Sequence, residues 1–309
     1  VLKLAGLLIA FLRFLNGDET AITRHFRRNR ERKGREAVSD ALVALASGES
    51  KQALARAEAA HKLLDDPTLT TLLLAQTAEQ AGERGRAEEA WKKLLAHDST
   101  RFVGIRGLLR QKLDAGDTAT ALKLAERAFA LKPKHPETQD ILLKLQAQTA
   151  DWDGARATLE SKRKAGALPK AVFQRRDAVL ALQQARTVMQ DSAAIEAREA
   201  AIEANKLSPD LIPAAVLAAR SYIAQGNTKH AARILRKAWE VQPHPDLAGA
   251  FAEIEPNETP QERLRRFGPL TDVHADTPEA MMLKAELAIA AEEFPEARRA
   301  IGKLPVDHP

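Results

Sequence analysis

The stretch that decides the fold is AGDTATALKLAERAFALKPKHP, residues 115–136. Gly116 is typical of a tight turn between two helices, because glycine adopts backbone conformations that other residues avoid. Ala121 and Ala125 follow at a spacing that lines one face of a helix. Pro133 ends that helix, since proline cannot continue the helical hydrogen-bond pattern. The stretch therefore predicts a turn, a helix and a second turn.

The same pattern returns along the chain. Alanines at the equivalent position are separated by 34 residues four times, by 42 residues once and by 66 residues once. Four turn glycines lie five residues before such an alanine. The alanines, called the repeat alanines below, are Ala53, Ala87, Ala121, Ala155, Ala197, Ala231 and Ala297, and the glycines are Gly48, Gly82, Gly116 and Gly226. The repeated unit is helix, glycine turn, helix, proline turn.

This period resembles the tetratricopeptide repeat over about residues 36–309. The second-helix half of the motif is well met. The first-helix half departs from it: where the family favours Trp, a small residue and Tyr, the first repeat has Ala37, Ala41 and Ala44. The resemblance implies an all-α fold, a right-handed superhelical solenoid of helix pairs, with about eight repeats over residues 37–309.

Two places should interrupt the regular array. The 42-residue interval after Ala155 predicts elongated helices, and the 66-residue interval hides a degenerate repeat near residues 245–277. The chain stops at KLPVDHP, where another repeat would start, without a polar capping helix. We therefore expect the natural protein to continue.

The composition favours a folded, helix-rich protein. The 309 residues are 45% hydrophobic but only 4% aromatic. The absence of cysteine excludes disulfides, thiolate metal sites and cysteine nucleophiles. The formal net charge of +5 is modest for this length, so we expect no nucleic-acid partner.

The chain opens with the apolar run VLKLAGLLIAFLRFL, residues 1–15. As a helix this run would span roughly 22 Å at about 1.5 Å per residue, less than the about 30 Å of a hydrocarbon core. Because the chain starts at Val1 rather than Met, we interpret residues 1–20 as the end of a longer transmembrane helix. An interfacial amphipathic helix and a buried core helix are the alternatives. A signal peptide is disfavoured, because its charges would precede the apolar run.

A basic cluster follows the apolar run and contains a single acid, Glu31. Its members are Arg24, Arg27, Arg28, Arg30, Arg32, Lys33 and Arg35. Such clusters stay on the cytoplasmic side and bind anionic lipid headgroups. We expect residues 21–36 to form a basic juxtamembrane helix, with the bulk of the chain in the cytoplasm. The alternative is an ordinary solvated helix face; RNA binding is disfavoured, because no aromatic stacking platform accompanies the charges.

The sequence lacks the common catalytic motifs. It has no phosphate-binding glycine loop, no dinucleotide-type glycine cluster and no His-Glu-x-x-His metal motif. Asp151 and Asp153 lie in a turn between helices, where Asp is a common helix cap rather than a catalytic pair. We therefore expect a protein that is not an enzyme and that has no catalytic residues and no metal.

Three histidines precede a proline and should lie in loops between repeats: His135, His244 and His308. Of these, His135 and His244 are candidate axial ligands if the chain binds haem. The alternative is that they are loop residues and that the protein has no cofactor.

Repeat solenoids bind partners through the surface lined by their first helices. One exposed position of those helices recurs at Leu42, Gln76, Arg110 and Lys144, with Arg220 equivalent in a later repeat and Arg106 one turn before Arg110. The four basic residues, Arg106, Arg110, Lys144 and Arg220, predict a groove that suits an acidic or carboxylate-bearing partner segment. Solvated helix faces are the alternative.

The junction LLIAFLRFLNGDETAITRHFRRNRERKG, residues 7–34, leads into ALVALASGE and the repeats. It resembles HemY-type proteins of proteobacteria, which have two membrane helices followed by cytoplasmic tetratricopeptide repeats. The resemblance implies an inner-membrane protein of late haem (porphyrin) biosynthesis that acts as a scaffold or haem-handling partner of its enzymes. A flavin-dependent oxidase shares the HemY name, but nothing in this sequence supports that activity. The resemblance transfers no individual haem ligand.

Together these patterns predict a non-enzymatic scaffold at the bacterial inner membrane. Its partners would be haem-pathway enzymes or a membrane complex, together with anionic lipid headgroups. Two alternatives are a carrier that binds haem or porphyrin itself and an assembly factor for a membrane complex.

Overall fold

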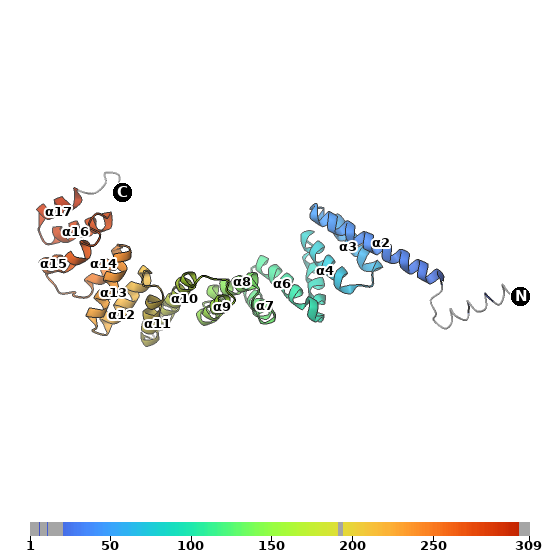
Figure 1. Cartoon of the computed structure of the whole chain (residues 1–309), viewed down its shortest axis with the longest axis horizontal. Coiled ribbons are helices and arrows are strands. Elements are labelled where there is room, and N and C mark those ends of the chain that lie inside the picture. The colour runs from blue at the N-terminus through green and yellow to red at the C-terminus, as the bar shows by residue number, and fades with distance from the viewer. Residues whose placement is uncertain (1–5, 7–10, 12–20, 191–193, 303–309) are drawn as a thin grey trace. The chain divides into compact units, whose positions relative to one another are not determined.

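A computed structural model describes residues 21–190 and 194–302, together with Gly6 and Phe11. Within these residues every regular element is a helix, which confirms the predicted all-α, helical-repeat fold (Figure 1). The predicted membrane segment, residues 1–20, and the C-terminal KLPVDHP lie almost entirely outside the described residues. Among the described helices, none combines the length and the apolar character that crossing a bilayer requires.

The chain divides into two compact units. The N-terminal unit is Val1–Thr138 and the C-terminal unit is Gln139–Pro309. The N-terminal unit contains α2 (Ala21–Ala46), α3 (Ser50–Leu63), α4 (Pro67–Gln80), α5 (Arg84–Lys93), the 3-10 helix η1 (Leu94–Ala96), α6 (Asp98–Asp114) and α7 (Thr118–Leu131).

Helix α8 (Pro136–Gln148) starts just before the boundary and continues into the C-terminal unit. The remaining helices of that unit are α9 (Trp152–Lys164), α10 (Lys170–Gln190), α11 (Ala194–Leu207), α12 (Ile212–Ala224), α13 (Thr228–Val241), α14 (Pro245–Ala252), α15 (Pro260–Thr271), α16 (Pro278–Ala290) and α17 (Phe294–Ile301). Consecutive helices pack as pairs, for example α4 on α5 and α12 on α13.

The repeat alanines form the contact faces of the helix pairs. All seven are at most 4% exposed. A methyl side chain fills little space, so two helices that meet over alanines approach each other closely. Glycine allows an even closer approach in α6. A Cβ on Gly107 would lie 2.2 Å from the ring of Trp91, a distance that no real contact allows.

The turns between paired helices use a left-handed residue. Gly48, Gly82, Gly116 and Gly226 have φ between 71° and 78°. The same conformation occurs without glycine at Ala150, with φ 57°, and at Glu292, with φ 61°. Ala150 lies 34 residues after Gly116, so the turn persists where its sequence signal is lost.

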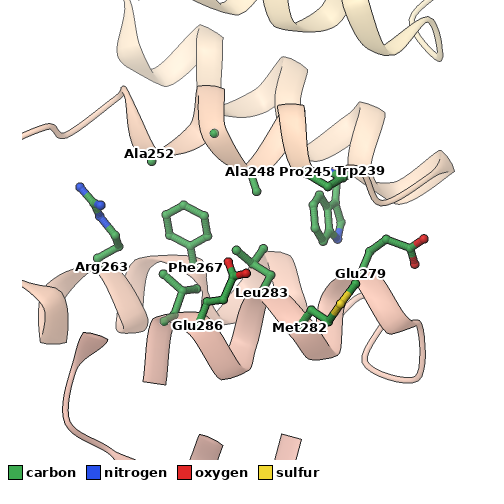
Figure 2. Close-up of a pocket in the computed structure, with 12 residues that line it drawn as sticks. Trp239, Pro245, Ala248, Ala252, Arg263, Phe267, Glu279, Met282, Leu283 and Glu286 are labelled. Carbon is green, nitrogen blue, oxygen red and sulfur yellow. The ribbon is translucent and has the colours of Figure 1, made fainter. Parts of the chain in front are cut away.

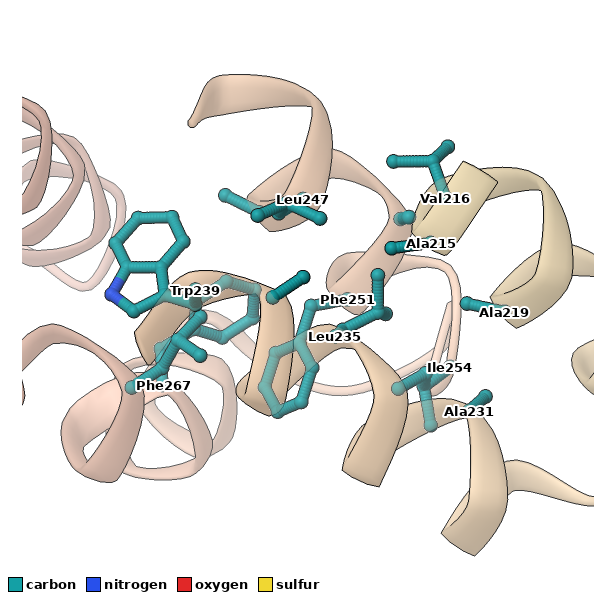
Figure 3. Close-up of a cluster of buried hydrophobic side chains, with 14 of the residues drawn as sticks. Ala215, Val216, Ala219, Ala231, Leu235, Trp239, Leu247, Phe251, Ile254 and Phe267 are labelled. Atoms are coloured by element: carbon teal, nitrogen blue, oxygen red, sulfur yellow. The ribbon is translucent and has the colours of Figure 1, made fainter. Parts of the chain in front are cut away.

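The two places where the sequence predicts an interruption of the array differ from the regular repeats in helix length and in core residues. Helix α10, at 21 residues, is elongated, as the 42-residue interval predicts. The degenerate repeat near residues 245–277 is a real helix pair, with α14 only eight residues long and Pro269 inside α15. Its core is aromatic: Phe251 and Phe267 meet edge to face at 4.9 Å between ring centroids, beside Trp239 (Figure 3).

Helix α2 joins the basic cluster to the first repeat without a break. It runs through residue 36, the expected boundary between the juxtamembrane helix and the repeats. Its first buried residue is Gly34, followed by Ala37, Ala41 and Ala44. The preceding turns of the helix are largely exposed.

Candidate partner-binding surface

The predicted groove positions are exposed on the first helices of their pairs. These positions are Leu42 on α2, Gln76 on α4, Arg110 on α6, Lys144 on α8 and Arg220 on α12. Arg106 is partly buried one turn before Arg110. The repeat register therefore places these side chains as an exposed series within each unit.

Three of the four groove cations are already paired with acids. Arg106 bonds to Glu137 at the start of α8, and Arg110 lies 3.9 Å from the carboxylate of Glu79 on α4. In the C-terminal unit, both Nε and Nη2 of Arg220 donate to Glu253, directly after α14, at 2.6–3.1 Å. Each pair connects consecutive repeats. The charges of these arginines are therefore balanced by glutamates of neighbouring repeats. The surface that the arginines form is less basic than the residue types suggest.

The hydrogen bonds and the burial of these ion pairs shift the pKa values of their members. The hydrogen bonds to Glu253 raise the pKa of Arg220. Burial is the largest effect on Glu79 and raises the pKa of its carboxyl, against the smaller opposing effect of Arg110. Lys144 is exposed and has no ion pair within the part of the chain that the structure describes. It is the one groove cation there with an unbalanced charge.

The sequence analysis missed a second basic surface, on the outer face of α13. Exposed basic side chains recur there at helical spacing, at Lys229, Arg233, Arg236 and Lys237. Arg236 lies over the ring of Phe251 at 5.7 Å, and Arg233 bonds to His230. The signal was present in TKHAARILRKAWEV, where basic residues lie opposite the repeat alanine. It was missed because α13 is the second helix of its pair, and only the first helices were expected to bind a partner.

Both candidate haem ligands are helix caps. His135 Nδ1 accepts from the backbone N–H of Thr138 at 3.3 Å, and its ring packs against Phe102. His244 Nδ1 accepts from the backbone N–H of Asp246 at 3.1 Å. A neutral imidazole that accepts at Nδ1 carries its proton on Nε2. Binding iron through Nε2 would therefore cost each helix its cap.

The two carboxylates at the start of α9, Asp151 just before it and Asp153 in its first turn, have separate structural roles. Asp151 accepts from the backbone N–H of Gly154 at 3.0 Å, which confirms the predicted cap. Asp153 is not a cap; it accepts from Gln184 of α10 at 3.0 Å, an interaction that the sequence did not predict. Across the described residues no three His, Cys, Asp or Glu side chains gather as a metal site.

The basic cluster lies in the N-terminal part of α2. Residues 23–33, which hold all of it except Arg35, are called the basic arm below. Arg30 reaches the next helix, α3, where it donates to the carbonyls of Lys62 and Leu63. Arg27, Arg32 and Arg35 form pairs one turn away with Glu31 or Glu36, at 3.1–3.9 Å. Arg24, Arg28 and Lys33 have no ion pair within residues 21–190 and 194–302. The side chain of Phe26, among these charges, is 66% exposed.

The paired helices, left-handed turns and buried repeat alanines define a tetratricopeptide-type helical-repeat protein. Residues 1–82 match the family described as the HemY protein N-terminus. This match covers the junction on which the sequence resemblance rests. A comparison with curated proteins finds no match.

Several solved structures are similar to the chain at low identity. A tetratricopeptide repeat protein from Parabacteroides merdae is 14% identical, with a TM-score of 0.42, over 84% of this chain and 99% of that one. Pseudomonas aeruginosa pilF is 17% identical, with a TM-score of 0.36, over 74% and 100%. Naa15/Naa10 bound to HypK matches at 14% identity and a TM-score of 0.44, over 87% and 47%. None of these similarities assigns a partner or an activity to this chain.

Proposed function

We propose that this protein is a membrane-anchored, non-enzymatic scaffold that recruits partner proteins on the cytoplasmic face of a bacterial inner membrane. We further propose that its partners are enzymes of late haem or porphyrin biosynthesis. The observation that supports this most is the junction: an apolar run, a basic arm and the first repeat follow one another within the residues that match the HemY family.

The basic arm would hold the first repeat close to the membrane. Each basic side chain near an anionic surface contributes about 1 kcal/mol. Arg24, Arg28 and Lys33 are available for this role, since no acid in the described residues pairs with them. Because α2 is a single helix from Ala21 to Ala46, lipid contact at its start fixes the direction in which the repeats leave the surface.

The repeats would then act by position. A tether converts encounters between partners into events at high local concentration, so recruitment alone accelerates transfer of a poorly soluble intermediate. The exposed first helices offer side chains at a fixed spacing for this purpose. No chemical step by the scaffold is needed.

The test is affinity purification of the full chain from bacterial membranes in mild detergent, with the co-eluting proteins and the absorption spectrum recorded together. We expect a haem-pathway enzyme to co-elute without a stoichiometric Soret band. A Soret band near one haem per chain that survives removal of partners would instead establish a haem carrier. Co-elution of a different membrane complex alone would establish an assembly factor.

The membrane contact is tested separately with the same preparation. The arm variant Arg24→Gln/Arg28→Gln/Lys33→Gln should stay in the membrane fraction under washes that remove peripheral proteins, as the parent chain does. It should, however, be captured less well by vesicles that contain anionic phosphatidylglycerol. A matched variant, Arg84→Gln/Arg127→Gln/Lys123→Gln, removes the same charge from α5 and α7. Equal capture of both variants would contradict a lipid-binding role for the arm.

A further inference from the structure

The C-terminal unit contains a cavity of about 340 Å³ that none of the roles above uses (Figure 2). It lies among α13, α14, α15 and α16, beside the unusually short helix α14. Apolar side chains supply most of its wall: Trp239, Ala248, Phe267, Met282, Leu283 and Leu287. Ligand sites in proteins start at about 300 Å³, so the cavity is large enough for one or two large side chains.

The wall of this cavity holds an unsatisfied hydrogen-bond donor. Trp239 is 1% exposed, and its Nε1 is buried with no hydrogen-bond partner among the residues that the structure describes. Figure 2 shows the indole reaching toward α16, with its nitrogen on the side of Met282. An unpaired buried donor destabilises a fold, and native structures contain few of them. Met282, flexible and 36% exposed, is the side chain whose movement would admit an acceptor.

The charge at the mouth of the cavity is negative. Glu279 and Glu286 of α16 line the cavity, and neither has an ion pair among the described residues. Arg263, the cation of the lining, is bound to Glu258 at 2.9 Å. Its charge is therefore balanced within the fold, whereas the two glutamates of α16 remain to be balanced by an occupant.

We propose that this cavity is the anchor site for a partner protein segment that places a large apolar side chain next to a lysine or arginine. The apolar side chain fills the space under Trp239, a carbonyl of the segment accepts from the indole N–H, and the cation lies between Glu279 and Glu286. The proposal rests on the scaffold function and names the chemistry of the segment recruited. It also separates the cavity from the groove, where the unbalanced charge among the described residues is the cation of Lys144.

The test uses displayed random 12-residue peptides, selected on the immobilised full chain. Gly249 of α14 lines the cavity, and a Cβ there meets no atom within 4 Å, so the side chain of Gly249→Phe starts in open space and should block the site. Gly268→Phe is the matched control, since Gly268 of α15 is equally unobstructed and does not line the cavity. Enriched peptides should carry Leu, Phe or Trp within four residues of Lys or Arg. Their binding should fall at least about tenfold on the Gly249 variant and be unchanged on the control.

A second arm of the test addresses the charges and the indole. Glu279→Lys/Glu286→Lys should shift the selected peptides from basic to acidic, whereas Glu240→Lys/Glu255→Lys, at two exposed glutamates that do not line the cavity, should not. Trp239→Phe keeps the ring but removes the donor and should weaken the selected peptides about fivefold or more, whereas Trp91→Phe, in the other unit, should not. Peptides without charge preference, equal binding to the blocked variant, or no enrichment would overturn the proposal.

Failure here is distinguishable from failure of the scaffold function. Peptide selection on the isolated chain needs neither a membrane nor a haem-pathway enzyme. A chain that selects no peptide but co-elutes with an enzyme recruits it through another surface. A chain that selects basic, apolar peptides but co-elutes with no haem-pathway enzyme has the anchor site and a different partner.

Discussion

The N-terminal repeats and the repeats around α14 solve the same packing problem in different ways. In the N-terminal unit, alanine and glycine faces bring helices so close that Gly104 and Gly107 have no room for a Cβ beside Trp91. Around α14 the core is built from Trp239, Phe251 and Phe267, and a cavity remains next to it. In the N-terminal unit small residues allow close helix contact, whereas around α14 large aromatic residues form the core beside a space that a ligand can use.

The largest effect should come from removing an aromatic side chain of the second region. Phe251 is 1% exposed and contacts Phe267, so Phe251→Ala should destabilise the C-terminal unit by about 3–5 kcal/mol. Chemical denaturation measures it, with Trp239 fluorescence as the reporter. Val241→Ala, at a side chain that is 62% exposed, should change little. Similar losses for both variants would mean that the aromatic cluster does not hold the unit together.

Glycine substitutions should have opposite signs in the two regions. Gly107→Ala puts a methyl into the ring of Trp91 and should destabilise the N-terminal unit by about 1–3 kcal/mol. Gly249→Ala, where the added carbon meets nothing, should stabilise the C-terminal unit by about 0.5–1 kcal/mol, since alanine favours the helix. Gly85→Ala is the control within the N-terminal unit, because its position is also open. The denaturation midpoints of the three variants test these signs. A loss of stability in Gly249→Ala would contradict open space at this position of the cavity.

Glycine at the two positions where another residue replaces the turn glycine should make the chain more stable. Ala150 and Glu292 hold a left-handed conformation that costs an L-residue about 1–2 kcal/mol. Ala150→Gly and Glu292→Gly should therefore stabilise the chain by about 1 kcal/mol, and Gly116→Ala should destabilise it by a similar amount. Thermal unfolding of the three variants tests the signs. A stabilising Gly116→Ala would contradict the conformation assigned to these turns.

The sequence predicted the helix pairs because each repeat carries its own signals. Glycine at Gly48 or Gly82 and alanine five residues later act locally, so their spacing alone gives the turn and the contact face. The pairing of the groove arginines could not be predicted, since Glu253 and Arg220 are 33 residues apart and meet only once the repeats stack. The cavity was equally hidden, because its lining comes from four helices, α13 to α16, and not from any one motif.

Two partly buried glutamates extend the comparison to pH. In the C-terminal unit, Glu258 accepts from Arg266 and Arg263 at 2.5–2.9 Å, and these hydrogen bonds lower the pKa of its carboxyl. In the N-terminal unit, burial raises the pKa of Glu79. The folded chain thus binds its proton less readily than the unfolded chain at Glu258 and more readily at Glu79.

The signs of the two contributions to stability are therefore opposite. The contribution of Glu258 is present above the carboxyl's unfolded pKa, near 4.5, and is lost as the pH falls through the lower folded value. The burial of Glu79 favours its neutral form, so its contribution is present at low pH and is lost as the pH rises through the raised folded value. Both effects should be smaller than those of the glycine substitutions, since each concerns one side chain at the edge of a helix pair.

The measurement is denaturant unfolding between about pH 3.5 and about pH 6.5, comparing each Gln variant with the parent chain. Trp152→Phe/Trp239→Phe leaves Trp91 to report the N-terminal unit, and Trp91→Phe reports the other. The stability difference between parent and Glu258→Gln should grow as the pH rises, and the difference for Glu79→Gln should change in the opposite direction. Parallel curves would mean that burial does not outweigh Arg110 at Glu79, and the N-terminal pair would then be an ordinary ion pair like that of Arg263 and Glu258.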